Sequence, residues 1–307
     1  LGRKSMKKIL ITGATDGIGK QTLLNIAKDN HHVIFVGRNE KKCQSVLKEI
    51  KSVTANKNID FFVNDLSLVS ENKLLAEKVR KKYSNLDVLI NNVGALFIER
   101  QETAEGYEKT FALNHLGVFT LTLELLELLK SNSRARIVNV SSAAHFNVID
   151  KKIKDKTNRT IFEKILFQTN FNADDLQAKI KFKGAHQYSR TKLMNILFTY
   201  KLHQDYLAGT NVTVNCLHPG FVASKFGHNN TGFFKSFIKF GQKVSAVSLE
   251  DGSSASTFLA LSEDVKNISG KYFDEDCSQI KSSALSYQQS LQNNLWEKSK
   301  ELINLKK

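Results

Sequence analysis

A tyrosine and a lysine lie four residues apart in the stretch HQYSRTKLMN, at Tyr188 and Lys192. If this stretch begins a helix, both side chains leave the same face, because four residues make just over one turn. A free phenol loses its proton only near pH ~10, and a neighbouring ammonium that favours phenolate brings its acid-base chemistry closer to neutrality. The spacing is also common by chance, so the isolated pair favours an ordinary amphipathic helix.

A second group of residues is typical of a phosphate-binding turn. The stretch TGATDGIG, residues 12–19, lies between an apolar run and a helical pattern and has glycines at positions 13, 17 and 19. Glycine lets the backbone approach a diphosphate closely, and the N-terminus of the following helix offers N–H donors and a positive dipole end. The spacing is G-x-x-x-G-x-G, and a purely structural turn is the alternative.

The end of the next apolar run bears on the choice of dinucleotide. It reads VIFVGRN, with Arg38 after Gly37 and no acid before Glu40. An acid at this position typically binds the ribose hydroxyls of NAD, whereas an arginine accommodates the 2′-phosphate of NADP. We therefore predict that NADP(H) is preferred over NAD(H), with Arg38 as the phosphate clamp and Lys20 as its helper. A solvated surface arginine is the alternative.

Two further runs end in small polar residues, at Asn64-Asp65-Leu66 and at Asn91-Asn92-Val93-Gly94. Both sets lie where an adenine edge and a ribose are expected, although each also suits a turn or a helix cap.

Elements that position these residues alternate regularly along the chain. Short apolar runs at 7–11, 31–37, 59–65, 86–92, 135–142 and 211–220 are separated by helical patterns. Repeated strand and helix units predict an α/β fold: a Rossmann-type, doubly wound parallel sheet with helices on both faces. Ligands bind at the carboxyl ends of such strands, where the polar motifs lie. With no linker or repeat, residues 1–307 are predicted to form a single domain.

Two regions depart from the alternation. Residues 145–185 form a lysine-rich insertion, in which FEKILF and DDLQAKIKF are predicted to form short helices. Residues 224–247 carry an aromatic stripe interleaved with lysines, and residues 281–307 are predicted to form a helical tail.

Composition sets limits on the function. The net charge of +15 invites a nucleic-acid interpretation, but the lysines alternate with apolar and acidic residues as on solvated helix faces, so we expect no nucleic-acid partner. Three distant cysteines show no disulfide or metal spacing, and we expect no metal site. The first residues lack the apolar region of a secretory signal, and no long apolar run is present, so a cytoplasmic location is expected.

Taken together, these motifs resemble the short-chain dehydrogenase/reductase superfamily, and most of all its retinol dehydrogenase-like branch. The matching stretches, in family order from residue 7 to residue 274, are TGATDGIG, DL, NNVG, LNHLG, RIVNVSS, YSRTK, HPG and SGKYF. An ordered set of this kind is far more specific than any one of its members.

The resemblance implies roles for four catalytic residues. Tyr188 matches the general acid that protonates the substrate oxygen, and Lys192 matches the lysine that lowers the tyrosine pKa and binds the nicotinamide ribose. Ser142, rather than its neighbour Ser141, matches the serine that polarises the substrate oxygen. Asn114 matches the asparagine that helps a water relay reach the lysine.

The resemblance also implies a set of cofactor contacts. Asp65 matches the adenine contact, Asn92 and Gly94 the segment beside the ribose, and Val222 the contact to the carboxamide. The full predicted set is Gly13, Thr15, Asp16, Gly17, Ile18, Gly19, Arg38, Asp65, Leu66, Asn92, Gly94, Lys192, Pro219, Gly220 and Val222.

The implied function is an NADP(H)-dependent oxidoreductase that interconverts a carbonyl and an alcohol on an apolar small molecule, such as a retinoid, steroid or lipid-like aldehyde or ketone. Residues 224–247 are expected to form the substrate lid, although a core-facing helix or peripheral contact with an anionic membrane also suits the aromatic stripe. A homodimer is a further expectation. Ser142 and Tyr188 are 46 positions apart, so the insertion between them must loop out, and it is expected to form one wall of the substrate cleft. The alternative function is a non-catalytic NADP(H)-binding sensor or scaffold.

Overall fold

The computed structural model describes residues 6–150, 168–220 and 247–304. In this part of the chain, one sheet has the strand order β10-β9-β8-β5-β4-β1-β2-β3, and all its pairs are parallel except β10 with β9. Its strands are β1 (Lys8–Thr12), β2 (His32–Gly37), β3 (Ile59–Val63), β4 (Val88–Asn91), β5 (Ala135–Val140), β8 (Val212–Leu217), β9 (Lys271–Phe273) and β10 (Gln279–Ile280).

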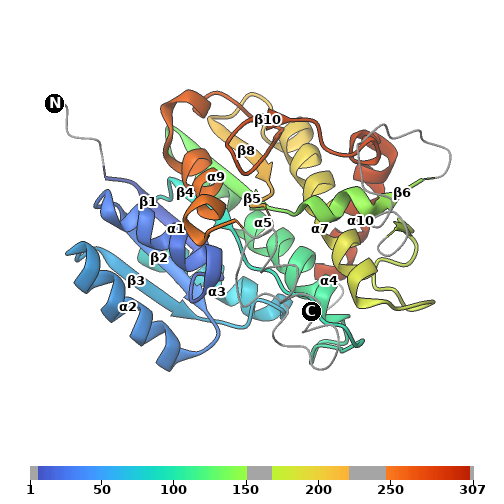
Figure 1. Ribbon diagram of the computed structural model, residues 1–307, viewed down its shortest axis with the longest axis horizontal. Coiled ribbons are helices and arrows are strands. Elements are labelled where there is room, and N and C mark those ends of the chain that lie inside the picture. The colour runs from blue at the N-terminus through green and yellow to red at the C-terminus, as the bar shows by residue number, and fades with distance from the viewer. Residues whose placement is uncertain (1–5, 151–167, 221–246, 305–307) are drawn as a thin grey trace.

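Helices cover both faces of this sheet (Figure 1). On one face lie α1 (Gly17–Lys28), α2 (Glu40–Thr54) and α9 (Leu249–Leu261). On the other lie α3 (Val69–Lys82), α5 (Gly117–Lys130) and α7 (Gly184–Lys201), with α10 (Gln289–Asn304) packed on α7. The predicted single-domain Rossmann-type fold is confirmed.

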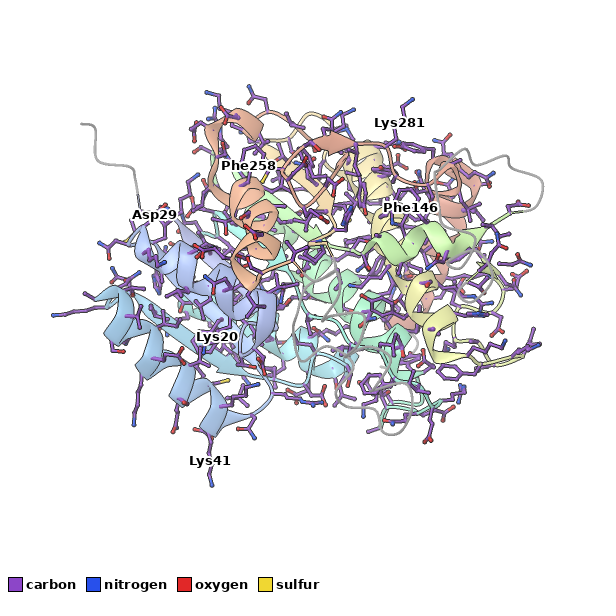
Figure 2. All side chains as sticks on the ribbon, in the orientation of Figure 1. Lys20, Asp29, Lys41, Phe146, Phe258 and Lys281 are labelled. Atoms are coloured by element: carbon purple, nitrogen blue, oxygen red, sulfur yellow. The ribbon has the colours of Figure 1, made fainter. Side chains whose placement is uncertain are left out.

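The sequence explains why these elements form where they do. Every residue of β5 is buried, as expected for a strand covered on both faces. Side chains of Asn39 and Ser248 accept hydrogen bonds from the third backbone amides of α2 and α9, which are typical N-cap contacts, and Asp16 accepts the Gly17 N–H at the start of α1. Charged side chains such as Lys41 and Lys281 project outward (Figure 2).

The strand order opens a crevice at its switch point. The chain runs from β1 outward to β3 and then returns to place β4 on the other side of β1. Connections leave β1 and β4 in opposite directions, so the carboxyl ends of these strands are not covered, and ligands bind there in folds of this type. The glycine-rich turn and Asn92 follow β1 and β4 directly.

Short helices and strands occupy the connections between these elements. They are α4 (Lys109–Phe111), the π-helix η1 (Ala112–Leu116), the 3₁₀ helix η2 (Ala143–Asn147), β6 (Val148–Ile149), β7 (Thr169–Asn170), the π-helix η3 (Leu202–Tyr206), and the 3₁₀ helices η4 (Glu263–Val265) and η5 (Ala284–Tyr287). Together α4, η1 and α5 form one continuous helical stretch.

The short helix predicted for DDLQAKIKF is wrong, because residues 174–182 form turns. Ala178 has a left-handed backbone with φ 51°, which a right-handed helix does not tolerate. Both carboxylate oxygens of Asp175 accept backbone amides, from Lys179 at 2.7 Å and from Ile180 at 3.1 Å. These bonds satisfy donors that a helix would have used. FEKILF and most of the predicted lid, residues 224–246, lie outside the described residues.

The helical tail buries the largest side chain of the core. Trp296 on α10 stacks on Tyr206 with ring centroids 4.1 Å apart, and it also stacks on Phe198 of α7 at 5.8 Å. Across the described ranges, no helix has the length and apolar character needed to span a membrane.

Candidate active site

A cavity of about 440 Å³ lies at the carboxyl ends of β1, β2 and β4. From the predicted site it is lined by Gly13, Thr15, Asp16, Gly17, Ile18, Gly19, Arg38, Asp65, Leu66, Asn92, Gly94, Tyr188, Lys192 and Pro219. Ser142, Asn114 and Gly220 lie outside this lining, and Val222 lies outside the described residues. Lining residues not anticipated from the sequence include Lys42, Ser67, Phe97, Lys109, Leu113 and Ser141.

The glycine-rich turn packs directly on the loop after β4, which a side chain at either of two glycines would prevent. Gly13 has φ +66°, and a Cβ there would lie 2.9 Å from the Val93 Cα. A Cβ on Gly19 would lie only 2.3 Å from the Asn92 Nδ2. The turn lines the cavity and leads into the N-terminus of α1, where amide donors and the helix dipole favour an anion.

Asn92 supports this turn from the neighbouring strand. Its Nδ2 donates to the carbonyl of Thr12 at 3.0 Å and to that of Gly13 at 3.2 Å. Its backbone N–H donates to the Thr12 hydroxyl at 3.1 Å. Asn92, which the sequence analysis assigned to the segment beside the ribose, therefore also joins β4 to the turn after β1.

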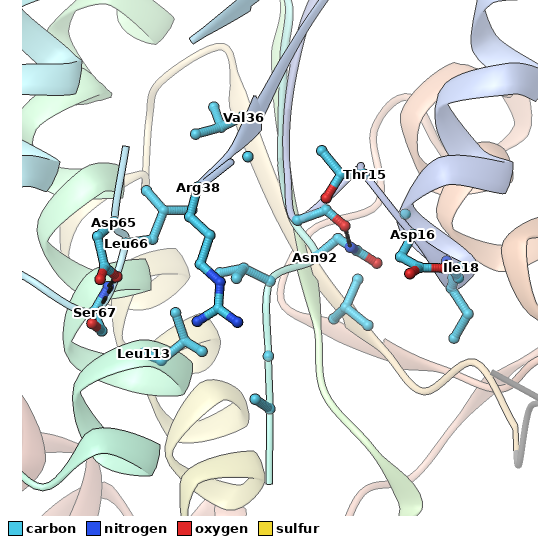
Figure 3. Close-up of a pocket in the computed structure, with 18 of the residues that line it drawn as sticks. Thr15, Asp16, Ile18, Val36, Arg38, Asp65, Leu66, Ser67, Asn92 and Leu113 are labelled. Carbon is cyan, nitrogen blue, oxygen red and sulfur yellow. Dashed lines mark hydrogen bonds between the residues drawn. The ribbon is translucent and has the colours of Figure 1, made fainter. Parts of the chain in front are cut away.

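Two cations lie at the end of the cavity formed by β2. Arg38 is exposed, and Figure 3 shows it reaching from the end of β2 toward Leu113, between Asp65 and Asn92. Lys42, in the first turn of α2, forms an ion pair with Asp16 at 2.8 Å. Its signal in the sequence was its position four residues after Arg38, on the helix that β2 leads into.

The structure does not place Lys20 beside Arg38 in the cavity lining. Lys20 is absent from the lining and pairs with Glu49 of α2, with 2.6 Å between Nζ and Oε1. Its position in α1 turns the side chain toward the neighbouring helix, a direction that proximity in sequence to the glycine-rich turn did not indicate.

Asp65 is oriented by its own loop. Its Oδ1 accepts hydrogen bonds from the backbone N–H of Ser67 at 3.0 Å and from the Ser67 hydroxyl at 2.7 Å. This turn fixes the carboxylate at the edge of the cavity opposite Asn92 (Figure 3).

At the other end of the cavity, Tyr188 and Lys192 share a face of α7, as their spacing predicts. The ammonium of Lys192 lies 5.6 Å from the centroid of the Tyr188 ring and donates to the carbonyl of Val140 at 3.0 Å. Burial lowers the pKa of Lys192 to about 8. Burial raises the pKa of Tyr188 to about 12, and a hydrogen bond with Ser142 acts in the opposite direction. In the protein alone, the expectation that Lys192 lowers the pKa of Tyr188 is therefore not met, because burial of the phenol dominates.

The two serines after β5 have different partners. The hydroxyl of Ser141 donates to the backbone carbonyl of Lys192 at 2.7 Å, which joins β5 to α7. The hydroxyl of Ser142 accepts the Ala144 N–H at 3.2 Å and is hydrogen-bonded to Tyr188. Although Ser141 lines the cavity, only Ser142 has its hydroxyl beside the phenol.

Asn114 lies on the single-turn π-helix η1, a feature that the sequence did not reveal. Its Oδ1 accepts the Ala95 N–H at 2.8 Å, and its Nδ2 donates to the Ala95 carbonyl at 2.9 Å and to the Thr191 hydroxyl at 3.1 Å. π-turns are frequent at functional sites because the extra residue redirects side chains. Here the turn directs Asn114 to the loop after β4.

Gly94 permits this convergence. A Cβ at Gly94 would lie 3.2 Å from the Lys192 ammonium and 3.5 Å from the Asn114 Oδ1. The glycine therefore marks the point where the β4 loop, η1 and α7 meet.

Three histidines beside the motifs have structural partners. His115 is fully buried, its Nε2 lies 2.8 Å from the Ser299 hydroxyl of α10, and burial lowers its pKa to about 3. The Nδ1 of His145 lies 2.7 Å from the carbonyl of Ser142, and its Nε2 accepts the N–H of Ser283 at 3.2 Å.

His218 forms a cluster with two acids. Ligand atoms of His218, Asp274 and Glu275 lie within 4.8 Å of one another. However, the Nε2 of His218 is 2.9 Å from the Asp274 carboxylate, and its Nδ1 accepts the Gly220 N–H at 3.2 Å. Both ring nitrogens are engaged, so the cluster fixes the Pro219-Gly220 turn at the edge of the cavity.

Known proteins are similar to this chain in sequence and in fold. Residues 7–152 match the family model for short chain dehydrogenases. The chain is 32% identical to human polyprenol dehydrogenase, over 96% of this chain and 84% of that protein. It is 34% identical to mouse retinol dehydrogenase 12, over 97% of this chain and 87% of that protein.

A solved structure agrees in fold. The RhlG/NADP active-site complex of Pseudomonas aeruginosa superposes with a TM-score of 0.65 at 18% identity, and the match covers 89% of this chain and 95% of that one.

The fold and the site together define an oxidoreductase that uses a nicotinamide cofactor to interconvert carbonyl and alcohol groups. The chain belongs to the short-chain dehydrogenase/reductase family, within its retinol dehydrogenase-like branch.

Proposed function

We propose that this protein is an NADP(H)-dependent oxidoreductase that reduces the carbonyl, or oxidises the alcohol, of an apolar small molecule. The observation that carries the proposal is that Tyr188 and Lys192 line one end of a cavity whose other end holds the glycine turn and Arg38, with Ser142 and Asn114 bonded beside them. Three parts of the chain far apart in sequence supply these four catalytic side chains.

The residues present fit a dinucleotide. The glycine turn and the N-terminus of α1, which line the cavity, would hold the diphosphate, Asp65 would hold the adenine end, and Lys192 would hold the nicotinamide ribose. When bound, the cofactor supplies or accepts the hydride.

The protein's own groups would handle the proton and the substrate oxygen. The hydroxyl of Ser142 orients the carbonyl oxygen, and Tyr188 delivers its proton to that oxygen as alkoxide charge develops. Because the Lys192 ammonium lies near the phenol ring, it stabilises the phenolate left behind. Asn114 holds the Ala95 backbone and Thr191 beside this lysine, which keeps a route for proton return through water.

Preference for NADP(H) is supported by two cations. Arg38 extends into the cavity from the end of β2, the position where an acid would favour NAD, and Lys42 lies in the next turn. Similarity in fold to an NADP complex is consistent with this preference.

The apolar class of substrate is supported by two relatives, whose names specify a polyprenol and a retinol. Its second support is the aromatic stripe of residues 226–240 in the sequence. Contact with a membrane surface and homodimerisation stay predictions from the sequence.

Measuring turnover together with cofactor binding distinguishes an enzyme from a protein that only binds NADP(H). NADPH oxidation is measured against retinoid, steroid, quinone and small aliphatic carbonyls, with NADH in parallel. We expect turnover of at least one apolar carbonyl and a higher kcat/KM with NADPH. Binding of NADPH without turnover of any carbonyl, or of any alcohol in the reverse direction, would favour the sensor or scaffold. Equal kcat/KM with NADH would contradict the role of Arg38.

A further inference from the structure

A buried carboxylate outside the cavity connects three segments around Tyr188. Glu108 has 0% exposed surface and lies immediately before α4. One oxygen accepts the N–H of Thr110 at 2.7 Å, and the other accepts the N–H of Phe111 at 2.8 Å. These bonds cap the continuous helical stretch that carries Asn114 six residues later.

The same carboxylate holds the helix that carries Tyr188. Nε2 of Gln187, the residue before Tyr188, donates to the Glu108 Oε2 at 2.9 Å. Gln187 is also fully buried, and its Nε2 donates a second bond to the carbonyl of Leu176 at 2.9 Å.

The third segment is the end of the insertion between Ser142 and Tyr188. Besides the Leu176 carbonyl, it supplies Gln177, whose side-chain Oε1 accepts the backbone N–H of Glu108 at 3.0 Å. Nearby, the side chain of Arg190 on α7 donates to the carbonyl of Asn170 at 2.9 Å. The described end of the insertion is therefore tied to the catalytic helix by polar contacts on both sides of Tyr188.

The start of α7 has little freedom to shift. A Cβ on Gly184 would lie 2.2 Å from the Phe97 carbonyl oxygen and 2.6 Å from the Ile98 Cα, so the helix begins directly on the backbone of the loop after β4. Phe97 itself lines the cavity. Gly184 against this loop and the bond from Gln187 to Glu108 both hold the first turn of α7 beside the cavity.

Gln187 acts in this network only as a donor. Its Oε1 is buried and has no hydrogen-bond partner among the described residues, whereas its Nε2 donates to both the Glu108 carboxylate and the Leu176 carbonyl. An apolar side chain of similar size would take this donor from both acceptors, at a cost of about 1–3 kcal/mol for each buried group left unpaired. The glutamine therefore provides a two-directional donor that links the segment before α4 to the insertion.

We infer that Glu108 and Gln187 are positioning residues that set the insertion's end and Tyr188 at a fixed distance from each other, and so align the substrate carbonyl with the phenol. Neither side chain lines the cavity, so both act through the segments they hold. The inference rests on the proposed function, since it assigns Tyr188 its catalytic role.

The test removes the hydrogen bond between Glu108 and Gln187 by changing each partner in turn. Gln187→Leu removes the donor and leaves the cap on α4 intact. Glu108→Asp keeps a good capping residue but draws the carboxylate back from Gln187. Gln292→Leu is the matched control, because Gln292 on α10 is also buried, donates from Nε2 to a carbonyl (that of Ser286, at 2.9 Å) and has an unpaired Oε1.

We expect both link variants to lower kcat/KM for the carbonyl by about 10- to 100-fold, with NADPH affinity changed less than about two-fold, because a small misalignment is enough to slow the reaction. The double variant should lose no more than the larger single loss, because both changes break one interaction. Gln292→Leu should keep the wild-type kcat/KM.

Unchanged kcat/KM in Gln187→Leu, an equal loss in Gln292→Leu, or additive losses in the double variant would each overturn the inference. Hydrogen exchange supplies a readout that does not depend on turnover. Faster exchange in residues 168–178 of Gln187→Leu than of Gln292→Leu supports the link, and equal exchange refutes it. If the wild type turns over no carbonyl or alcohol, the proposed function fails and the exchange result still decides the link.

Discussion

The two ends of the cavity are built in different ways. At the cofactor end, a single stretch of seven residues contributes Gly13, Asp16 and Gly19, and the next strand adds Arg38. At the substrate end, the surroundings of Tyr188 come from residues around positions 97, 108, 142 and 176. Long-range hydrogen bonds join the last three to α7, and the backbone at position 97 lies directly against Gly184.

This difference explains how each end keeps its shape. The cofactor end depends on close backbone approach, which is a property of a few glycines and of the strands on either side. The substrate end depends on buried polar side chains that meet across the fold, and each such group loses stability when its partner is removed. Changes at the two ends should therefore have separable effects on binding and on turnover.

The largest separation is expected for Tyr188→Phe. Removal of the hydroxyl eliminates the proposed proton donor, so kcat should fall by roughly 10²- to 10⁴-fold, while NADPH binding stays unchanged. Tyr200→Phe is the control, because Tyr200 lies on the same helix with its hydroxyl on Ser282. Steady-state kinetics and a binding titration measure both quantities. Similar losses in the two variants would contradict a specific role for Tyr188.

Lys192→Met tests the burial of a charge at the substrate end. The pKa of Lys192 is about 8 in the folded protein, below its usual 10.5. Above pH 8 the folded state has released a proton that the unfolded state retains, so the free energy of unfolding of the wild type rises with pH in this window.

The variant lacks this rise. From pH ~7.5 to pH ~9.5, urea unfolding should show the wild type gaining about 2 kcal/mol relative to Lys192→Met. A stability difference that stays constant over this range would mean that the ammonium is not desolvated as described.

Arg38→Gln tests the cofactor end. Loss of a charged hydrogen-bond donor to a phosphate should weaken NADPH binding by about 10- to 100-fold and leave NADH binding nearly unchanged. Lys20→Gln, which removes a cation paired with Glu49 instead, should leave both affinities at their wild-type values. Calorimetric titration with NADPH and with NADH measures these affinities. Equal weakening of NADH binding would show that Arg38 does not discriminate.

The smallest effects are expected from relief of backbone strain at two alanines, one after α2 and one in the insertion. Ala55, after α2, and Ala178, in the insertion, have φ of 56° and 51°. Glycine relieves left-handed strain, partly offset by its greater entropy when unfolded, so each alanine-to-glycine change should stabilise the protein by roughly 0.5–1 kcal/mol. Thermal unfolding measures both. A gain from Ala55→Gly alone would show that the insertion opens before the rest of the fold.

Several predictions from sequence succeeded because they depended on local patterns. Apolar runs located β1 to β5 and β8, and the order of motifs identified the family. Where side-chain direction mattered, the sequence was less informative. Lys20 faces Glu49, and Lys42 lies at the cavity instead, because helix geometry sets each direction. The helix predicted around Ala178 failed because the Asp175 carboxylate takes the backbone amides of a turn.

The sequence by itself determined the fold class, the family, the glycine turn and the spacing of Tyr188 and Lys192, since each depends on residues near one another in the chain. Only the tertiary structure decided which hydroxyl meets the phenol, how a π-turn directs Asn114, and how Glu108 joins Gln187 to the insertion. The physical reason is that buried polar groups must find partners, and those partners come from segments whose proximity is set by the packing of the whole fold.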